Sequence, residues 1–460
     1  MKNLLWRFAV LSWSASFLLA QVQPSPLPNA RSEAPPALYS ARTDRKIVPY
    51  PEKPPEFGPA GSVIIDPSFG SRITRVTDAQ ADPQHAGRSL FSPSSSEQNP
   101  WNTNSTMFYV NTTGGSFVLY AFDPATMKSH LASAPNLRWT PEPQFSYTDP
   151  SILYGIVRRD TVFQQFDVYT GKVTTVNNAS KCVKLRSTDS AGSPSVSFDD
   201  NRFTTTIGPG QDKNYLVYVY DRSLGCRWYN TQTGEIGGQW GPQGTVTVAD
   251  RFSIHNARMA KSGKFAYVTR GGGPGVGKGW VVWQIDTTSV SVCSRGCMGH
   301  HVLGYSHIVG ASEMSHPLDI WLRPLDQLEN ISPLISDLVP AKKFWYDSHF
   351  SWSNVDPRDS APVCFSTYRR DNPDTPGTPL VVTGPWENEI DCAETDGKGS
   401  KVWRFAHTYS TARNGFWSQP RGNVSQDGRF FLFTSDWEDQ LGKSPNGKGY
   451  RTDAFIVELH

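Results

Sequence analysis

The feature that most constrains the fold is a strand-rich unit that recurs along the chain at a spacing of roughly 40 to 50 residues. Each copy has a first strand, a turn, a β-rich second strand, a third strand that ends near a short turn, and a weaker fourth strand. The clearest copies lie at 98–130, 144–176, 193–237, 253–293, 305–328, 347–405 and 417–458. One such sheet cannot bury both of its faces alone, so neighbouring copies must stack on one another.

The last copy is one strand short. Residues 417–458 read as strand, turn, strand, loop and strand, with a tight turn at 426–428. Residues 71–78, SRITRVTD, read as a strand without partners of its own. We therefore predict an all-β fold, a seven-bladed β-propeller of four-stranded antiparallel blades over residues 61–460, in which this N-terminal strand completes the last blade. A series of two-sheet sandwiches is the alternative, and it would not explain why the count closes only with the early strand.

The composition agrees with many short strands and does not indicate binding to nucleic acid or to a membrane surface. The chain has 15 Trp, 17 Tyr and 24 Phe residues, together with 38 Gly and 35 Pro, which suits strands joined by turns. Its 44 basic residues nearly balance its 42 acidic residues, so no strong field would recruit nucleic acid or a membrane surface. We expect a monomer that binds neither.

The N-terminus has the layout of an export signal. Lys2 and Arg7 precede an apolar run from Phe8 to Ala20 that is too short to anchor the chain in a bilayer. We expect a signal peptide at 1–20, then a Pro-rich linker or strap at 21–60. The protein would then be secreted or periplasmic, with no membrane span.

The six cysteines fit an oxidising compartment. Paired consecutively, they are Cys182 with Cys226, Cys293 with Cys297, and Cys364 with Cys392. Six cysteines allow 15 connectivities, so this pairing is one hypothesis among several. Cys293 and Cys297, followed by His300 and His301, could instead hold zinc.

Candidate site residues come from the first strand of each blade, which lines the central channel of a propeller. Alignment of the copies on their first turn places Gln98, Gln144, Ser193, Asn256, His307, His349 and Arg421 at a similar height. His307 and His349 would lie on neighbouring blades and could reach one ion. With His255 or His301 as a third nitrogen donor and an oxygen from Gln98, Gln144 or Gln419, the set suits a divalent metal.

The turn sequences SQDG and DVYTGK resemble those of seven-bladed, WD-repeat-like propellers of exported bacterial proteins. The polar ring of histidines and glutamines is similar to that of oligogalacturonate lyases, which are seven-bladed propellers with a manganese-type site of histidines and a glutamine. This resemblance implies an acidic, uronate-containing polysaccharide as ligand and a metal-assisted lyase as the activity. The ion would be manganese, zinc or calcium.

The chemistry fits such residues. Removing the proton next to a uronate carboxylate requires that the charge of the carboxylate be neutralised and that a base take the proton. The candidate catalytic residues are Arg421, His349 and Tyr305, and the candidate metal ligands are His255, His307 and His349. The candidate ligand-binding residues are Gln98, Gln144, Arg404, His407 and Gln419.

Three other readings remain open. Channel-lining polar residues can simply bond to each other and to trapped water. The segment around Arg404 and His407 can pack blades together instead of binding sugar. The whole protein can be a non-catalytic propeller of the cell envelope that binds a glycan or a protein, or a structural component there. Whether it is an enzyme is not decided by the sequence.

Overall fold

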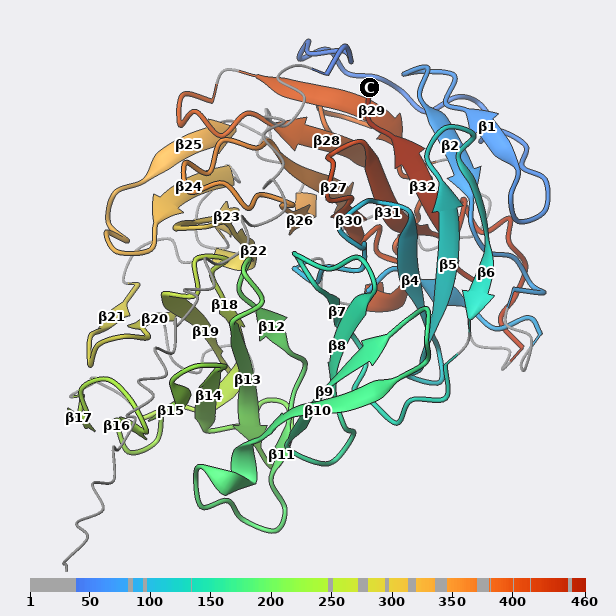
Figure 1. The fold of residues 1–460 in the computed structure, drawn as a ribbon. Helices are drawn as coiled ribbons and strands as arrows, with labels where there is room; N and C mark the ends of the chain where they lie inside the picture. The colour runs from blue at the N-terminus through green and yellow to red at the C-terminus, as the bar shows by residue number, and fades with distance from the viewer. Residues whose placement is uncertain are drawn as a thin grey trace, which may run out of the picture. The chain divides into compact units, whose positions relative to one another are not determined.

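The chain folds as an all-β propeller (Figure 1). The computed structural model describes residues 39–460 apart from 82–85, 94–96, 134, 247–250, 272–279, 294–297, 313–319, 336–345, 370–379, 381, 400, 414 and 446–448. The expected signal peptide at 1–20 therefore lies outside the described residues. Within them, no helix has the length and apolar character needed to cross a lipid bilayer.

The described strands are grouped in seven antiparallel sheets. The first holds β3 (Leu90–Phe91), β4 (Met107–Thr112), β5 (Phe117–Asp123) and β6 (Lys128–Ser133). The second holds β7 (Gln144–Phe145), β8 (Ile152–Ile156), β9 (Val162–Asp167) and β10 (Val173–Asn178). The third holds β11 (Ser190–Ala191), β12 (Ser195–Val196), β13 (Arg202–Gly208), β14 (Leu216–Asp221), β15 (Gly225–Asn230), β16 (Glu235–Gly238) and β17 (Gly244–Thr245).

The next three sheets have four strands each. The fourth holds β18 (Ile254–Met259), β19 (Phe265–Arg270), β20 (Val281–Gln284) and β21 (Val290–Val292). The fifth holds β22 (Met298–Leu303), β23 (His307–Ser312), β24 (Ile320–Pro324) and β25 (Ser332–Ile335). The sixth holds β26 (Tyr346–Ser351), β27 (Val363–Arg369), β28 (Glu389–Ala393) and β29 (Val402–His407). Two short 3-10 helices, η1 (Ala179–Lys181) and η2 (Gly415–Ser418), lie between sheets.

The seventh sheet joins the two ends of the described chain. It runs β30 (Gly422–Val424), β31 (Phe430–Ser435), β32 (Asp453–Glu458), β2 (Arg72–Arg75) and β1 (Val63–Ile65). Ile73 pairs with Val457 in the antiparallel ladder between β2 and β32, which lie side by side in Figure 1. The predicted closure by an N-terminal strand is thus confirmed, and β1 adds a fifth strand that the sequence did not predict. Gly428, in the predicted turn between β30 and β31, has a φ of 72°, which suits glycine.

Stacked sheets share their cores, which explains why single copies could not fold alone. One cluster combines Trp101 and Phe108 of the first sheet segment with Phe430, Leu432 and Ile456 of the seventh sheet, all fully buried. Such clusters join consecutive sheets, as propeller packing requires.

The first turns of neighbouring sheets are also linked by buried carboxylates. Asp200, with a φ of 56°, accepts hydrogen bonds from the backbone of Tyr147 at 3.1 Å and of Thr148 at 3.2 Å. Asp359, with a φ of 51°, accepts one from the backbone of Ser306 at 2.9 Å. Each carboxylate thus ties the turn of the preceding sheet to its own.

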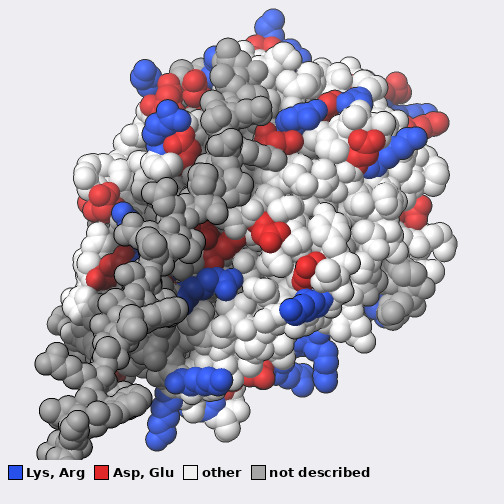
Figure 2. Space-filling view, viewed as in Figure 1, with Lys and Arg blue, Asp and Glu red and all other residues white. Residues whose placement is uncertain are grey.

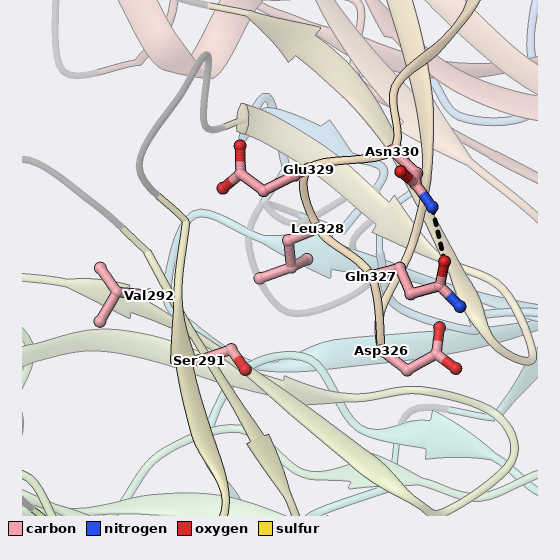
Figure 3. Close-up of a pocket in the computed structure, with 7 residues that line it drawn as sticks. All are labelled: Ser291, Val292, Asp326, Gln327, Leu328, Glu329 and Asn330. Carbon is pink, nitrogen blue, oxygen red and sulfur yellow. Dashed lines mark hydrogen bonds between the residues drawn. The ribbon is translucent and has the colours of Figure 1, made fainter.

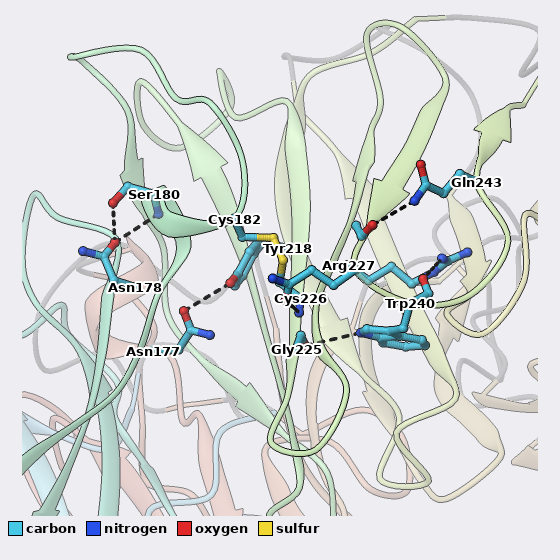
Figure 4. Close-up of a disulfide and its surroundings, with 12 residues drawn as sticks. Asn177, Asn178, Ser180, Cys182, Tyr218, Gly225, Cys226, Arg227, Trp240 and Gln243 are labelled. Atoms are coloured by element: carbon cyan, nitrogen blue, oxygen red, sulfur yellow. Dashed lines mark hydrogen bonds between the residues drawn. A yellow bond between two sulfur atoms is a disulfide. The ribbon is translucent and has the colours of Figure 1, made fainter.

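Two predicted disulfides are confirmed. The Cys182–Cys226 bond links the segment after η1 to β15 and so joins the second sheet to the third (Figure 4). The Cys364–Cys392 bond joins directly paired positions of β27 and β28. Cys297, which the third predicted pair requires, lies outside the described residues.

Residues 39–57 lie along the outer edge of the sixth sheet and against the seventh. The backbone N–H of Arg404 on β29 donates to the carbonyl of Arg42 at 2.9 Å. The hydroxyl of Tyr39 donates to the carbonyl of Gly428 at 2.8 Å, and the indole of Trp437 donates to that of Pro55 at 2.9 Å. We call residues 39–57 the N-terminal strap.

Candidate functional site

The candidate site is built around His349 on β26, the first strand of the sixth sheet. Strand alternation sends Phe350 into the core between sheets, so His349 projects from the opposite face. The Nε2 atom of His349 lies 2.9 Å from Oε1 of Gln419, and its ring stacks on His300 of β22 with a centroid distance of 4.3 Å. Neighbouring first strands therefore bring two imidazoles and an amide together.

The two histidines differ in their surroundings. His349 is buried, and burial, followed by repulsion from His300, lowers its pKa well below the usual value. His349 is therefore neutral at neutral pH. The side chain of His300 is 34% exposed. Its Nδ1 atom lies 2.9 Å from Oδ1 of Asp347 and 2.9 Å from the backbone oxygen of Ser348.

Arg421, directly before β30, supplies the cation of the site. It is fully buried, and none of its three guanidinium nitrogens has a hydrogen-bond partner in the part of the chain that the structure describes. Burial lowers the pKa of Arg421 to about 10, so the group still carries its charge at neutral pH. A buried charge without a partner is costly, and an anionic ligand would satisfy it.

Aromatic rings surround this guanidinium. Its central carbon lies 4.3 Å from the ring centroid of Phe416, 5.3 Å from that of Trp417 and 5.5 Å from that of Phe91. Phe416 and Trp417 belong to η2, and they are 42% and 53% exposed. The Phe416 ring also lies 6.4 Å from the ring of His349, so the imidazoles and the guanidinium border the same aromatic group. We call His300, His349, Phe416, Trp417, Gln419 and Arg421 the Arg421 site.

A second polar cluster on the first strands is paired internally. Arg258 of β18 contacts Glu97 at 3.0 Å and Glu142 at 3.6 Å. His301 of β22 lies 3.1 Å from Glu97, close enough for an ion pair although not aligned as a hydrogen bond. Gln98 donates to Glu142 at a long 3.5 Å. These charges largely offset one another, unlike that of Arg421.

The glutamines expected to bind a ligand have different surroundings. Gln144 accepts a hydrogen bond from the backbone of Val196 at 2.9 Å, which ties β7 to β12 of the next sheet. Gln98 lies in the second cluster, and its Oε1 atom has no partner within the described residues. Gln419, in contrast, lies beside His349.

The expected metal ligands are not brought together. His307 begins β23, a second strand, because the first strand of the fifth sheet starts at Met298 and not at Tyr305. Its Nδ1 atom lies 2.7 Å from Asp359 in the linked first turns. His255 lies on β18, exposed, with Nδ1 2.7 Å from Asp212. The sequence alignment of the fifth copy was thus wrong, and it missed His300 as the neighbour of His349.

Tyr305 lies in the same turn as Ser306, away from the predicted height of the first strands. Its backbone N–H donates to Asp359 at 2.5 Å, and its ring lies 5.2 Å from that of Phe198. The structure therefore places Tyr305 with the linked turns of neighbouring sheets and does not join it to His349.

A divalent ion does not fit the donors as they are placed. Among the described residues, no group of three or more His, Cys, Asp or Glu side chains is arranged to hold a metal ion. His349 and Gln419 already bond to each other, and His300 bonds to Asp347. The unpaired charge of Arg421 next to them would repel a second cation.

Arg404 and His407 have structural partners. Both lie on β29, the outer strand of the sixth sheet. Arg404 donates to both carboxylate oxygens of Glu389, at 2.6 and 2.7 Å, and to the carbonyl of Lys46 at 2.7 Å. The Nε2 atom of His407 lies 3.1 Å from the carbonyl of Val48. In the structure, polar groups of both residues contact the N-terminal strap.

A pocket elsewhere on the described surface has a different lining. A pocket of about 330 Å³ lies between β21 and the loop after β24 (Figure 3), lined by Ser291, Val292, Asp326, Gln327, Leu328, Glu329 and Asn330. It includes none of the predicted site residues. The face of the molecule in Figure 2 carries positive and negative side chains interspersed with uncharged surface.

The sequence did not single out Asp347, Glu97, Glu142 and Arg258, and it offered His300 only as part of a possible zinc site and not as the neighbour of His349. Of these, the position of His300 beside His349 had a usable signal, since residues 299–307, GHHVLGYSH, can be divided into two strands at Gly304. The others gave no local signal, because their partners lie on different sheets.

Comparison with known proteins shows solved structures that share the fold of this chain. No protein-family model matches the chain, and no curated protein matches it in sequence. The oligogalacturonate lyase of Vibrio parahaemolyticus has a TM-score of 0.54 at 10% identity, covering 89% of this chain and 99% of that one. An oligogalacturonate lyase in complex with manganese has a TM-score of 0.55 at 12% identity, covering 89% and 98%. At these identities the likeness shows the fold alone, a β-propeller similar to that of these lyases.

Proposed function

We propose that the protein binds an acidic saccharide at the Arg421 site and cleaves it as a lyase. The observation that carries this proposal is the buried guanidinium of Arg421, which lacks a hydrogen-bond partner in the described chain. A planar carboxylate matches the fork of a guanidinium and would replace the missing hydrogen bonds. The exposed rings of Phe416 and Trp417 offer apolar faces against which a sugar ring can pack.

The charge of Arg421 suits elimination next to a carboxylate. When the proton on the neighbouring carbon is removed, negative charge develops on the carboxylate, and a fixed cation in a dry site stabilises it strongly. The propeller likeness to oligogalacturonate lyases supports this reaction only as an analogy of fold. In this proposal Arg421 neutralises the charge of the substrate carboxylate, so turnover needs no added divalent ion.

We further propose that each of the seven sheets is one blade of the ring and that the protein works outside the cytoplasm. The seven-sheet grouping and the pairing of β2 with β32 support the count. The two disulfides support the compartment, because such bonds persist mainly in oxidising surroundings.

Binding is tested by calorimetry with oligogalacturonate and with a neutral oligosaccharide of equal length. We expect saturable binding of the acidic oligomer only, weakened at least about tenfold by Arg421→Gln, which corresponds to about 1.4 kcal/mol. Arg358→Gln is the matched control, because Arg358 is exposed and paired with Asp356. Equal affinity for the neutral oligomer, or an unchanged affinity of the Arg421 variant, would contradict the proposal.

Cleavage is tested by the absorbance of unsaturated products on a panel of uronate polymers, with and without chelator. We expect product formation in both conditions. Loss of activity with chelator and its return with manganese would show that a metal, and not Arg421, neutralises the carboxylate.

A non-catalytic binding propeller is the second candidate. It is favoured by the second polar cluster, whose charges are paired with each other, whereas none of the three guanidinium nitrogens of Arg421 has a hydrogen-bond partner among the described residues. A non-catalytic propeller would show saturable binding of the acidic oligomer and would form no unsaturated product.

A further inference from the structure

We infer that His407 is a pH-sensitive clasp for the N-terminal strap, and that the strap separates from β29 when this imidazole is protonated. His407 ends β29, the outer strand of the sixth sheet, and its side chain bonds to the strap. The inference concerns this edge of the sheet and not the Arg421 site, so it does not depend on the proposed function.

The hydrogen bond to the strap fixes the tautomer of His407. Its Nε2 atom lies 3.1 Å from the carbonyl oxygen of Val48, which can only accept a hydrogen bond. In the neutral ring the hydrogen is therefore on Nε2 and the lone pair is on Nδ1. The Nδ1 atom is buried and has no hydrogen-bond partner among the described residues. A second proton on Nδ1 would thus create a buried donor without an acceptor.

Aromatic rings close around the imidazole. Tyr50 of the strap stacks on it, with 4.3 Å between the centroids and 22° between the planes. Phe69 and Tyr409 approach it edge-on, with centroid distances of 5.0 and 5.8 Å, and His407 is fully buried. Of these three rings, Tyr50 belongs to the strap, so displacement of the strap opens the imidazole to water.

An imidazolium is unfavourable in this place, although one of its faces meets an aromatic ring. The attraction of a cation to the ring of Tyr50 is smaller than the cost of keeping an unpaired charge out of water. Once the strap is displaced, water can solvate the imidazolium. Acid therefore favours the displaced strap.

The titratable groups around His407 come from each element that packs on it. They are Tyr50 of the strap, Asp66 between β1 and β2, Glu389 of β28, and Arg404 and Tyr409 on either side of His407 in the sequence. Asp66 favours the imidazolium, but its Oδ2 atom already accepts the backbone N–H of His407 at 3.1 Å and the hydroxyl of Tyr409 at 3.0 Å. Glu389 lies opposite His407 in the ladder and is paired with Arg404.

The direction of the pH effect follows from these surroundings. Burial lowers the pKa of His407 and outweighs the attraction of Asp66 and the bond to Val48. A solvated histidine has a pKa near 6.5. Below about pH 6.5 the displaced state thus binds more protons than the docked state, and docking weakens by at most about tenfold per pH unit as the pH falls. Above that pH the contribution of His407 to docking is complete.

Two buried carboxyl groups of β28 act in the opposite direction. Burial raises the pKa of Glu389 and of Asp391. The part of that burial which the strap supplies favours docking at low pH. The contribution of His407 must therefore be isolated by substitution of His407 itself.

The test follows hydrogen exchange at the backbone N–H of Arg404, which donates to the carbonyl of Arg42 in the strap. Protection is the ratio of the intrinsic exchange rate to the measured rate at the same pH. We expect the protection of this amide to be about tenfold lower at pH 5 than at pH 7.5. A peptide from β14, in the third sheet, is the internal reference and should keep its protection within about twofold.

The variants separate His407 from the other titrating groups. His407→Gln removes the titration and keeps a side-chain N–H that can donate to Val48, so protection at Arg404 should change less than about twofold between the two pH values. His130→Gln is the matched control, because His130 is an exposed histidine on β6, the outer strand of the first sheet. This control should keep the pH dependence of wild type.

Two measurements do not require the His407 variant to fold. Ile47 of the strap is 50% exposed, so a fluorophore attached to the variant Ile47→Cys can report the mobility of the strap. Its anisotropy should fall between about pH 6.5 and pH 5. Nitrogen-15 NMR of the imidazole rings should show the hydrogen of His407 on Nε2 at pH 7.5.

Several results would overturn the inference. Equal protection of the Arg404 amide at the two pH values in wild type, or a constant anisotropy of the label, would show that acid does not loosen the strap. A hydrogen on Nδ1, or a His407→Gln variant with the pH dependence of wild type, would show that His407 is not the clasp. Loss of protection in β14 in parallel with that at Arg404 would show that acid loosens the whole fold. Each of these results leaves the test of oligogalacturonate binding unaffected.

Discussion

Two buried arginines, Arg404 and Arg421, have opposite surroundings. The surroundings of Arg404 fit a role in stability, and those of Arg421 fit a role in binding. Arg404 makes a bidentate pair with Glu389 and donates to the strap, so its charge is fully compensated. The guanidinium of Arg421 has three aromatic neighbours and no hydrogen bonds within the described chain. Residues that lower stability in this way are often kept because function needs them.

Exchange of each arginine for methionine should therefore have opposite effects on the free energy of unfolding. We expect Arg404→Met to lower it by about 3–5 kcal/mol, since Glu389 is left buried without its partner. Arg421→Met should raise it by about 1–3 kcal/mol, since an unsatisfied buried group is removed. Urea denaturation of both variants measures the difference. An Arg421 variant as unstable as the Arg404 variant would show that this guanidinium has a structural partner.

The buried carboxyl group of Asp436 makes the free energy of unfolding depend on pH. Burial raises the pKa of Asp436 to about 7, against hydrogen bonds from Thr411 that lower it. In the unfolded chain an aspartate ionises near pH 4. Between these values the folded state holds the proton and the unfolded state does not, so stability falls as pH rises and then levels off above about pH 7.

The size of this effect can be tested with Asp436→Asn. Wild type should lose about 1.4 kcal/mol of stability per pH unit from this group between about pH 4 and 7. The variant should show a flatter profile over the same range. Denaturation at several pH values measures both profiles, and identical slopes would contradict the assignment.

At the scale of elements, the N-terminal strap protects the outer strand β29. An edge strand exposes unpaired backbone groups that can recruit other chains. The strap satisfies one of them through the bond between Arg404 and Arg42 and packs Tyr39 against Trp403 and Phe405. Its aromatic contacts make it part of the folded domain.

Tyr39→Ala should lower the free energy of unfolding by about 3 kcal/mol, because a buried ring is lost. Tyr39→Phe keeps the ring and loses only the hydrogen bond to Gly428, so it should cost about 1 kcal/mol. Thermal and urea denaturation of the pair check this ratio. A negligible effect of Tyr39→Ala would mean that the strap contributes nothing to the stability of the sheets.

At the scale of the whole molecule, stability depends on the seventh sheet, in which β2 meets β32. Asp453 on β32 is buried and bonds to Arg75 of β2 at 2.6 Å and to Arg451 at 2.5 Å. A second pair across the same strands, Arg72 with Glu458, is partly exposed. The buried pair should therefore carry most of the electrostatic contribution to closure.

Asp453→Ala should destabilise the protein by about 3–5 kcal/mol, because it leaves two arginines without their carboxylate. Glu458→Gln, the partly exposed counterpart on the same strand, should cost less than about 1 kcal/mol. Denaturation of both variants, with a double-mutant cycle between Asp453 and Arg75, measures the coupling. Equal costs for the two variants would show that closure does not depend on the buried pair.

The sequence alone predicted the all-β propeller fold, the return of an N-terminal strand to the C-terminal sheet and two disulfides. These follow from patterns along the chain, such as the alternation in β31 and β32 and the turn before Phe430, which depend on local geometry. The register of the fifth copy was wrong because two β-rich runs separated by a short turn look alike when read in sequence.

Only the tertiary structure decided which side chains meet. Three features each depend on the packing of several sheets: His300 stacks on His349, Arg404 holds the strap, and the guanidinium of Arg421 is buried without a hydrogen-bond partner in the described chain. Residue order fixes the strands but not the distances between residues on different strands. The fold of this protein could therefore be predicted from its sequence, whereas the composition of its candidate site could not.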